Sequence, residues 1–82
     1  MENGQPRPLY VIADEIKSDW GTRVNFAAHP YLAAMSQLSV LTDTYGMDNA
    51  KGIIQYFLSN ATSWRGDVAR RIKAELRSMI TR

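Results

Sequence analysis

The chain contains no cysteine, one histidine and three prolines among its 82 residues. The absence of cysteine excludes disulfide bonds and metal sites built on thiolates, so packing must carry the stability of the fold. A single histidine leaves little material for catalysis that pairs an activated Ser or Thr with a histidine base. A Gly-rich phosphate loop is also missing, because Gly46, Gly52 and Gly66 match neither the Walker spacing nor the dinucleotide spacing.

Long apolar runs are absent as well. The longest are only a few residues, such as 53–54 and 56–58, whereas a membrane-spanning helix needs about 20. The first eight residues do not show a basic region followed by an apolar stretch, so they do not resemble a signal peptide. We therefore expect a cytoplasmic protein without a membrane partner.

The residues that are present are those of an ordinary globular protein. Apolar residues make up 45% of the chain and charged residues 22%, far from the composition of disordered proteins. At this length we expect a single domain over 1–82 with a modest core, which buries roughly 60–65% of the surface of the unfolded chain.

Four stretches show apolar residues at three- and four-residue spacing, which predicts a compact all-α domain of four helices. The expected helices span about 8–20, 30–45, 48–60 and 63–81. Residues 1–7 are expected to form a flexible tail, because Pro6 and Pro8 oppose regular structure. A weak two-residue alternation near 23–27 predicts a short extended segment.

Residues at the expected helix ends support these boundaries. Gly21 and Gly46 stand where helices commonly end in a left-handed residue. Asp48 is a good N-cap for the third helix, and Thr62 or Ser63 can cap the fourth.

The last helix places two chemistries on opposite faces. Arg70, Lys73 and Arg77 lie opposite the apolar stripe and are our candidate contacts for a partner or for nucleic acid. The apolar stripe consists of Trp64, Val68, Ile72, Leu76, Met79 and Ile80.

Charge is distributed unevenly along the chain. Residues 1–63 carry four basic and six acidic side chains, whereas 64–82 carry six basic and two acidic ones, within a net charge of +2. Such a basic end suits an acidic protein surface or nucleic acid, but it also complements the dipole of its own helix.

Catalytic candidates are few. His29 precedes Pro30 and is better interpreted as a loop residue before a helix than as a base. Asp14, Glu15 and Asp19 could bind Mg²⁺, but no second carboxylate cluster answers them, which favours a solvated helix face. We expect no enzyme activity, no catalytic residue, no cofactor and no metal.

Four segments carry a resemblance to a known group of proteins: 16–20, 30–35, 43–48 and, most strongly, 56–76. They resemble small proteins encoded by bacteriophages of actinobacteria. The resemblance implies a phage origin and a location in the host cytoplasm. It implies no particular activity, and it assigns no catalytic or binding residue.

Three functional hypotheses follow. The first is a non-enzymatic phage accessory protein that binds a host or phage protein through the surface of helix 63–81. The alternative is a DNA-binding regulator of the helix-turn-helix type, using helices 48–60 and 63–81. A further alternative is a structural homo-oligomer in which Val11, Val40 and Leu58 pack between subunits.

Overall fold

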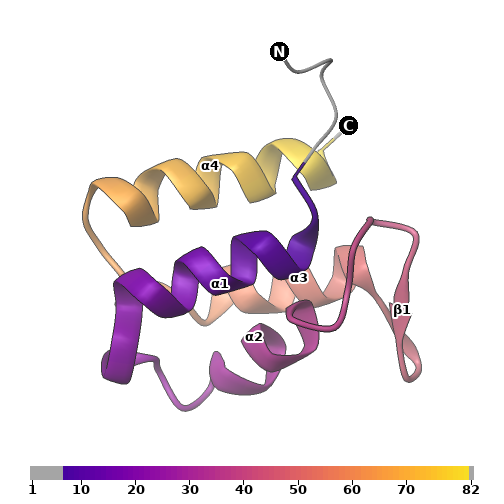
Figure 1. Cartoon of the computed structure of the whole chain (residues 1–82), viewed down its shortest axis with the longest axis horizontal. Helices are drawn as coiled ribbons and strands as arrows, with labels where there is room; N and C mark the ends of the chain where they lie inside the picture. Colours follow the sequence, from indigo (N-terminus) through magenta and orange to yellow (C-terminus); the bar gives the residue numbers. More distant parts are fainter. Residues whose placement is uncertain (1–6, 82) are drawn as a thin grey trace.

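The computed structural model describes residues 7–81 and contains four α-helices, a short 3₁₀ helix and a two-stranded hairpin (Figure 1). This part of the chain is mostly helical, as expected, although the hairpin was not predicted. The expected tail at 1–7 lies outside the described residues except for Arg7. In chain order the elements are α1 (Leu9–Trp20), η1 (Gly21–Arg23), α2 (His29–Met35), β1 (Thr44–Tyr45), β2 (Asp48–Asn49), α3 (Ala50–Ser59) and α4 (Asp67–Ile80).

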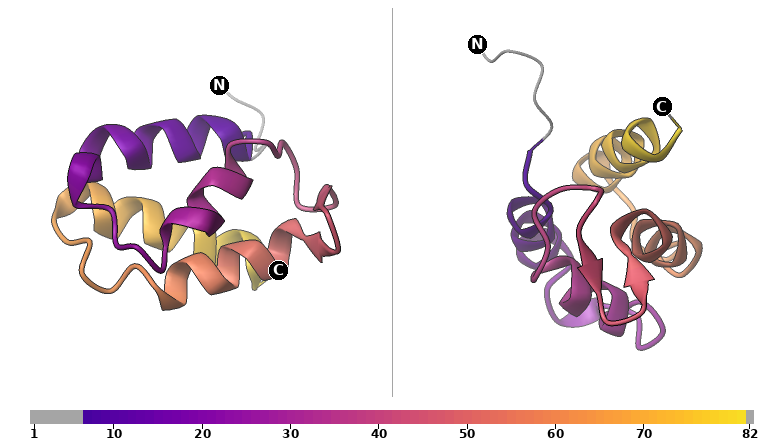
Figure 2. Two further views of the ribbon diagram at one scale, coloured as in Figure 1. Left: turned by 90° about the horizontal axis from the view of Figure 1, so that it is seen from below. Right: turned by 90° about the vertical axis from the view of Figure 1, so that its right-hand side faces the viewer.

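The four helices surround the core. α4 packs against both α1 and α3 and runs antiparallel to α3, and the three helices are seen nearly end-on in the right-hand view of Figure 2. α2 is short and contacts both α1 and α3, while α4 contacts the same two helices from the other side. No helix within residues 7–81 is long and apolar enough to cross a membrane.

α1 forms close to its expected bounds. Its apolar stripe is buried, and Gly21 ends it with a φ of 62°, its N–H donating to the carbonyl of Lys17. No side chain caps its beginning. Instead, the N–H groups of Leu9 and Tyr10 donate to the carbonyls of Ser39 and Leu38, at 2.9 Å each. A segment 30 residues further along the chain therefore supplies the acceptors that a free helix end requires.

The helix expected at 30–45 is less than half that length, because α2 ends at Met35. The carboxylate of Asp43 accepts the backbone N–H groups of Ser39 and Val40, at 2.8 and 3.0 Å, and this stabilises an irregular segment in place of another helical turn. Both hydrogen bonds lower the pKa of Asp43, and the one from Val40 has the larger effect. The hairpin follows, with Gly46 at its turn and a φ of 64°. Gly46 therefore serves a hairpin rather than a helix end.

α3 begins at Ala50, and its cap is Asn49 rather than Asp48. The Asn49 side chain accepts the N–H of Gly52 at 2.7 Å. Asp48 lies in β2, where it pairs with Tyr45 across the hairpin. An N-cap residue directly precedes the first helical turn. Because Asp48 pairs with Tyr45 in the hairpin, the helix begins at Ala50 and the N-cap position falls on Asn49.

α4 begins at Asp67, four residues later than expected. Gly66 occupies its N-cap position, and no side chain caps the helix. The expected caps, Thr62 and Ser63, lie exposed in the preceding turn. Gly66 has a φ of 112°, which separates the loop from the helix and leaves Trp64 outside it. Trp64 is nevertheless buried, so its place in the core comes from the loop and not from the stripe of α4.

The extended segment expected near 23–27 is also absent. η1 occupies Gly21–Arg23, and the next residues turn, with the Asn25 side chain accepting the N–H of Ala27 at 2.9 Å. Such a local hydrogen bond to an Asn side chain stabilises a turn in place of the extended backbone that a strand needs.

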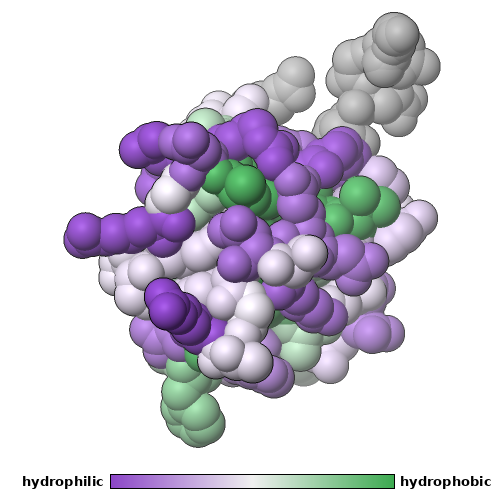
Figure 3. Space-filling view, turned by 60° about the vertical axis from the view of Figure 1, so that its left-hand side comes forward, coloured by the Kyte–Doolittle hydropathy of each residue, from purple (hydrophilic) through white to green (hydrophobic). Residues whose placement is uncertain are grey.

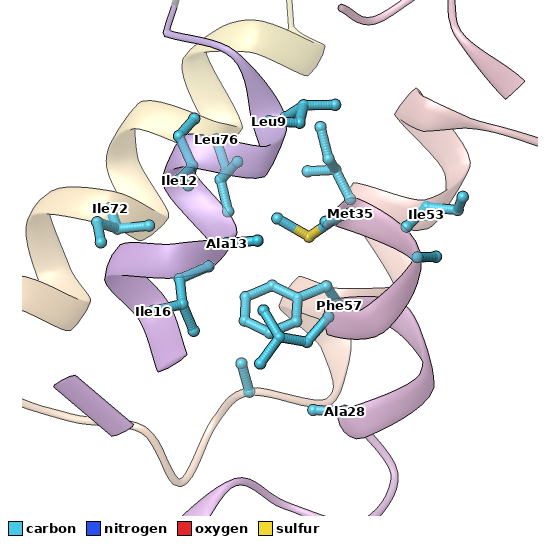
Figure 4. Packing of buried hydrophobic residues seen from close by; sticks show 14 of the residues in the cluster. Leu9, Ile12, Ala13, Ile16, Ala28, Met35, Ile53, Phe57, Ile72 and Leu76 are labelled. Atoms are coloured by element: carbon cyan, nitrogen blue, oxygen red, sulfur yellow. The ribbon is translucent and has the colours of Figure 1, made fainter. Parts of the chain in front are cut away.

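The core lies between all four helices (Figure 4). Phe57 of α3 is fully buried and points into the space between α1 and α2, where Ile16 and Met35 approach it. Ile72 and Leu76 of α4 belong to the same core as Phe57. No buried side-chain nitrogen or oxygen in the described part of the chain lacks a hydrogen-bond partner.

Candidate interaction surface

Trp64 connects the loop before α4 to the end of α1. Its ring stacks on Trp20 with 5.6 Å between centroids and an interplanar angle of 15°, and it meets Phe57 edge to face at 6.3 Å. Its indole N–H donates to Asp19 Oδ2 at 2.8 Å. Trp64 is 2% exposed, so its ring anchors this loop to the core.

Lys73 lies against Trp64 and does not project freely. Its ammonium donates to the Trp64 carbonyl at 2.6 Å and stands 5.8 Å from the centroid of the indole ring. Burial, followed by the nearby charges of Arg77 and Arg65, lowers the pKa of Lys73. One of the three candidate contacts is therefore partly engaged in holding the loop to α4.

Arg70 and Arg77 are exposed, as the sequence predicts. Arg70 forms an ion pair with Asp67, but the two side chains are 78% and 95% exposed, and a pair in that environment contributes little. Arg77 forms no ion pair with any residue of 7–81.

Arg65 joins these cations, although the sequence did not single it out. The loop places it beside Gly66, where it lines a hollow of about 260 Å³ together with Arg70 and Lys73. The charge count of the last nineteen residues includes Arg65, but only the turn at Gly66 shows that it faces the same side as Arg70. We call Arg65, Arg70, Lys73 and Arg77 the basic surface.

The opposite side of α4 carries charges that neutralise one another. Arg7 forms two hydrogen bonds to Glu75, at 2.8 and 3.0 Å, and one to Glu15 at 2.9 Å. Glu15 also pairs with Arg71. The guanidinium groups of Arg71 and then Arg7 lower the pKa of Glu15. Charges on this side therefore join α1 to α4, whereas Arg70 is the one cation of the basic surface that pairs with a carboxylate within residues 7–81.

The acidic residues singled out in the sequence do not come together as a site. Glu15 belongs to the ion network, Asp19 accepts from Trp64, and Asp14 is exposed on α1. His29 is the exposed first residue of α2. Among residues 7–81, no three His, Asp or Glu side chains form a group that could hold a metal ion.

The other two hypotheses find different degrees of support in the geometry. α3 and α4 lie antiparallel (Figures 1 and 2), whereas the helices of a helix-turn-helix cross at about 90–120°. Of the apolar residues proposed for an oligomer contact, Val11 and Val40 are exposed, but Leu58 packs partly buried against the core.

Figure 3 turns forward the end of the molecule where α1 finishes and α4 begins. Hydrophilic side chains dominate this face and several project from it, while hydrophobic groups form small separate patches. The chain matches no known family profile, no curated protein and no solved structure.

Proposed function

We propose that this protein is a non-enzymatic interaction module that binds an acidic surface of another protein through the basic surface. The observation that carries the proposal is the unequal use of charge on the two sides of α4. Arg71 and Arg7 are neutralised by Glu15 and Glu75, whereas Asp67 is the one carboxylate paired with the basic surface within residues 7–81. Positive side chains left without partners raise the local potential and attract acidic partners.

The rigid support of these cations favours binding of a shaped partner. Arg65 follows the buried Trp64, and Lys73 is hydrogen-bonded to the same residue. The backbone at Arg65 and the ammonium of Lys73 are therefore held in place by Trp64, so less conformational entropy is lost when a partner binds. The resemblance to phage proteins supports an accessory role in the host cytoplasm, with a host or phage protein as partner.

DNA binding is the alternative that a test must separate. The antiparallel packing of α3 and α4 does not present α4 as a recognition helix, which favours the protein partner. A row of cations can still follow a phosphate backbone without reading bases. Its signature is affinity that falls steeply as salt concentration rises.

The experiment compares two variants with the same change in charge. In Arg70/Arg77→Gln the two exposed arginines of the basic surface are neutralised. The matched control, Lys51/Arg71→Gln, removes two positive charges from other faces. Each protein is immobilised and exposed to actinobacterial lysate, and the retained proteins are identified by mass spectrometry.

The expected result is that wild type and control retain the same acidic protein and that Arg70/Arg77→Gln loses it. Equal retention by all three proteins contradicts the role of the basic surface. A parallel titration of duplex DNA at low and high salt tests the alternative. Binding that is steeply salt-dependent and lost in Arg70/Arg77→Gln would assign the surface to DNA.

A further inference from the structure

Phe26 is the most unusual apolar residue near the basic end of the molecule. It lies in the turn between η1 and α2 and is 93% exposed, although most large apolar residues of the chain are buried. A phenylalanine left in water forgoes the stabilisation that burial of its ring would supply. Met47, at the tip of the hairpin, is also fully exposed, but it lines neither of the two hollows near Phe26 and His29.

Phe26 borders an apolar groove. With Ala27, His29 and Pro30 it lines a hollow of about 520 Å³. His29 also lines a second hollow of about 480 Å³, whose wall includes Leu32. Both hollows are open to solvent, since Phe26 and His29 in their walls are exposed. The two hollows meet at His29, so one groove runs between the end of α1 and the start of α2.

The rim of this groove is positive. Lys17 lines the second hollow, and no aspartate or glutamate within residues 7–81 lines either one. Arg23 and Arg65 line a further hollow of about 360 Å³, in which the carboxylate of Asp19 is already bonded to Trp64. Arg23 directly follows Thr22, which lines the second hollow, so the two hollows are neighbours along the chain. Arg65 belongs to the basic surface. We call this series of neighbouring hollows, from Phe26 past Arg23 to Arg65, the path.

We propose that this path binds an acidic segment of the partner that carries a large apolar side chain. The apolar side chain enters the groove beside Phe26, while carboxylates of the same segment face Lys17, Arg23 and the basic surface. This inference rests on the proposed function and names the chemistry of the partner. Hydrophobic burial in the groove supplies affinity, and the positive rim selects acidic sequences.

Other occupants fit less well. A second copy of the chain would bring two positive rims together, because symmetric dimers use the same patch on both subunits. A nucleic acid matches the charge, but it offers no aliphatic side chain for the groove. Both are outcomes of the experiment below.

The experiment measures fluorescence anisotropy with three labelled peptides of equal length. The first contains Glu and Ala only. The second has the same Glu residues with a Leu and a Trp four positions apart, and the third is the second with every Glu replaced by Gln. The second peptide is expected to bind about tenfold more tightly than the first, and the third to bind no better than the first.

Two variants and a control locate the apolar contact. Phe26→Ala removes the exposed ring, and Ala33→Phe places a bulky side chain on the exposed rim of the second hollow. Both are expected to reduce the affinity for the second peptide to that for the first. Met47→Ala, which removes an equally exposed apolar side chain from the hairpin, should change nothing.

The outcomes separate the two proposals. Equal affinity for the first two peptides, with both lost in Arg70/Arg77→Gln, overturns the groove inference and leaves the proposed function intact. Failure of both peptides to bind wild type contradicts both proposals. Tight binding of the Gln peptide removes the acidic partner. Tighter binding of a single-stranded oligonucleotide that depends on Phe26 assigns the path to nucleic acid, and dimerisation that Phe26→Ala abolishes assigns it to self-association.

Discussion

The indole N–H of Trp64 donates to the carboxylate of Asp19 across 45 positions of sequence, at 2.8 Å. This bond joins the last turn of α1 to the loop before α4, and it satisfies the one polar group of a ring that is otherwise buried. Because Arg65 directly follows Trp64, the same bond helps to set the position of the basic surface. Trp64 thus contributes both to the stability of the fold and to the position of the candidate site.

Asp19→Ala should lower the free energy of unfolding by about 1–2 kcal/mol, because the buried indole N–H loses its acceptor. Urea unfolding followed by tryptophan fluorescence measures the loss. Asp19→Asn keeps an acceptor oxygen and should restore most of it. Unchanged stability of Asp19→Ala would show that water replaces the carboxylate at no cost.

Substitutions at Lys73 and Arg77, which the helical period places on the same face of α4, should differ in their effect on stability. Lys73→Met loses the bond to the Trp64 carbonyl and the contact with its ring, so we expect a loss of about 1 kcal/mol of stability. Arg77→Met should change stability by less than about 0.5 kcal/mol, since Arg77 is exposed. Thermal unfolding compares the two. Equal losses would contradict a structural role for Lys73.

The ion network should make stability depend on pH through Glu15. Arg71 and Arg7 hold the pKa of this carboxyl below its usual 4.5, so the unfolded chain takes up the proton first as the pH falls. The stabilisation is therefore complete above about pH 4.5 and is lost below it as Glu15 becomes protonated in the folded state.

Glu15→Gln should accordingly be less stable at neutral pH by about 1 kcal/mol or less, and should lose less stability on acidification. Urea midpoints measured between neutral and acidic pH test this. Asp14→Asn is the control, since Asp14 lies on the same helix but outside the network. If the two variants follow the same pH curve, the network does not contribute.

Asn49 and Asp48 give a direct comparison of sequence and structure. Asn49→Ala removes the side chain that accepts from Gly52 and should cost about 1 kcal/mol. Asp48→Ala should cost less than about 0.5 kcal/mol, because its exposed side chain does not cap α3. Chemical unfolding of both variants decides. A larger loss at Asp48 would place the beginning of α3 one residue earlier.

The accuracy of the predictions followed the range of the interactions involved. α1 was predicted within one residue, because its stripe and Gly21 act over a single turn. The end of the helix expected at 30–45 was predicted ten residues too late, because Asp43 binds the backbone N–H groups of Ser39 and Val40, and a period of apolar residues does not reveal such a bond. Leu38 still reaches the core and Leu41 packs partly buried against it, but both do so from a loop.

The candidate site shows the same division. The exposure of Arg70 and Arg77 follows from helical period alone. The engagement of Lys73 and the addition of Arg65 depend on Trp64 leaving the helix at Gly66. Phe26 resembles a core residue by type, and the turn at Asn25 places it in solvent.

The sequence by itself determined a mostly helical chain, the residues that form the apolar stripes of α1, α3 and most of α4, and the excess of positive charge after Trp64. These follow from local period and composition. Only the tertiary structure decided which charges of α4 are neutralised and which remain available, because Arg7 and Glu15 reach α4 from another part of the chain. It also decided that Trp64 reaches the core from a loop, since its partners Trp20 and Asp19 lie more than 40 positions away.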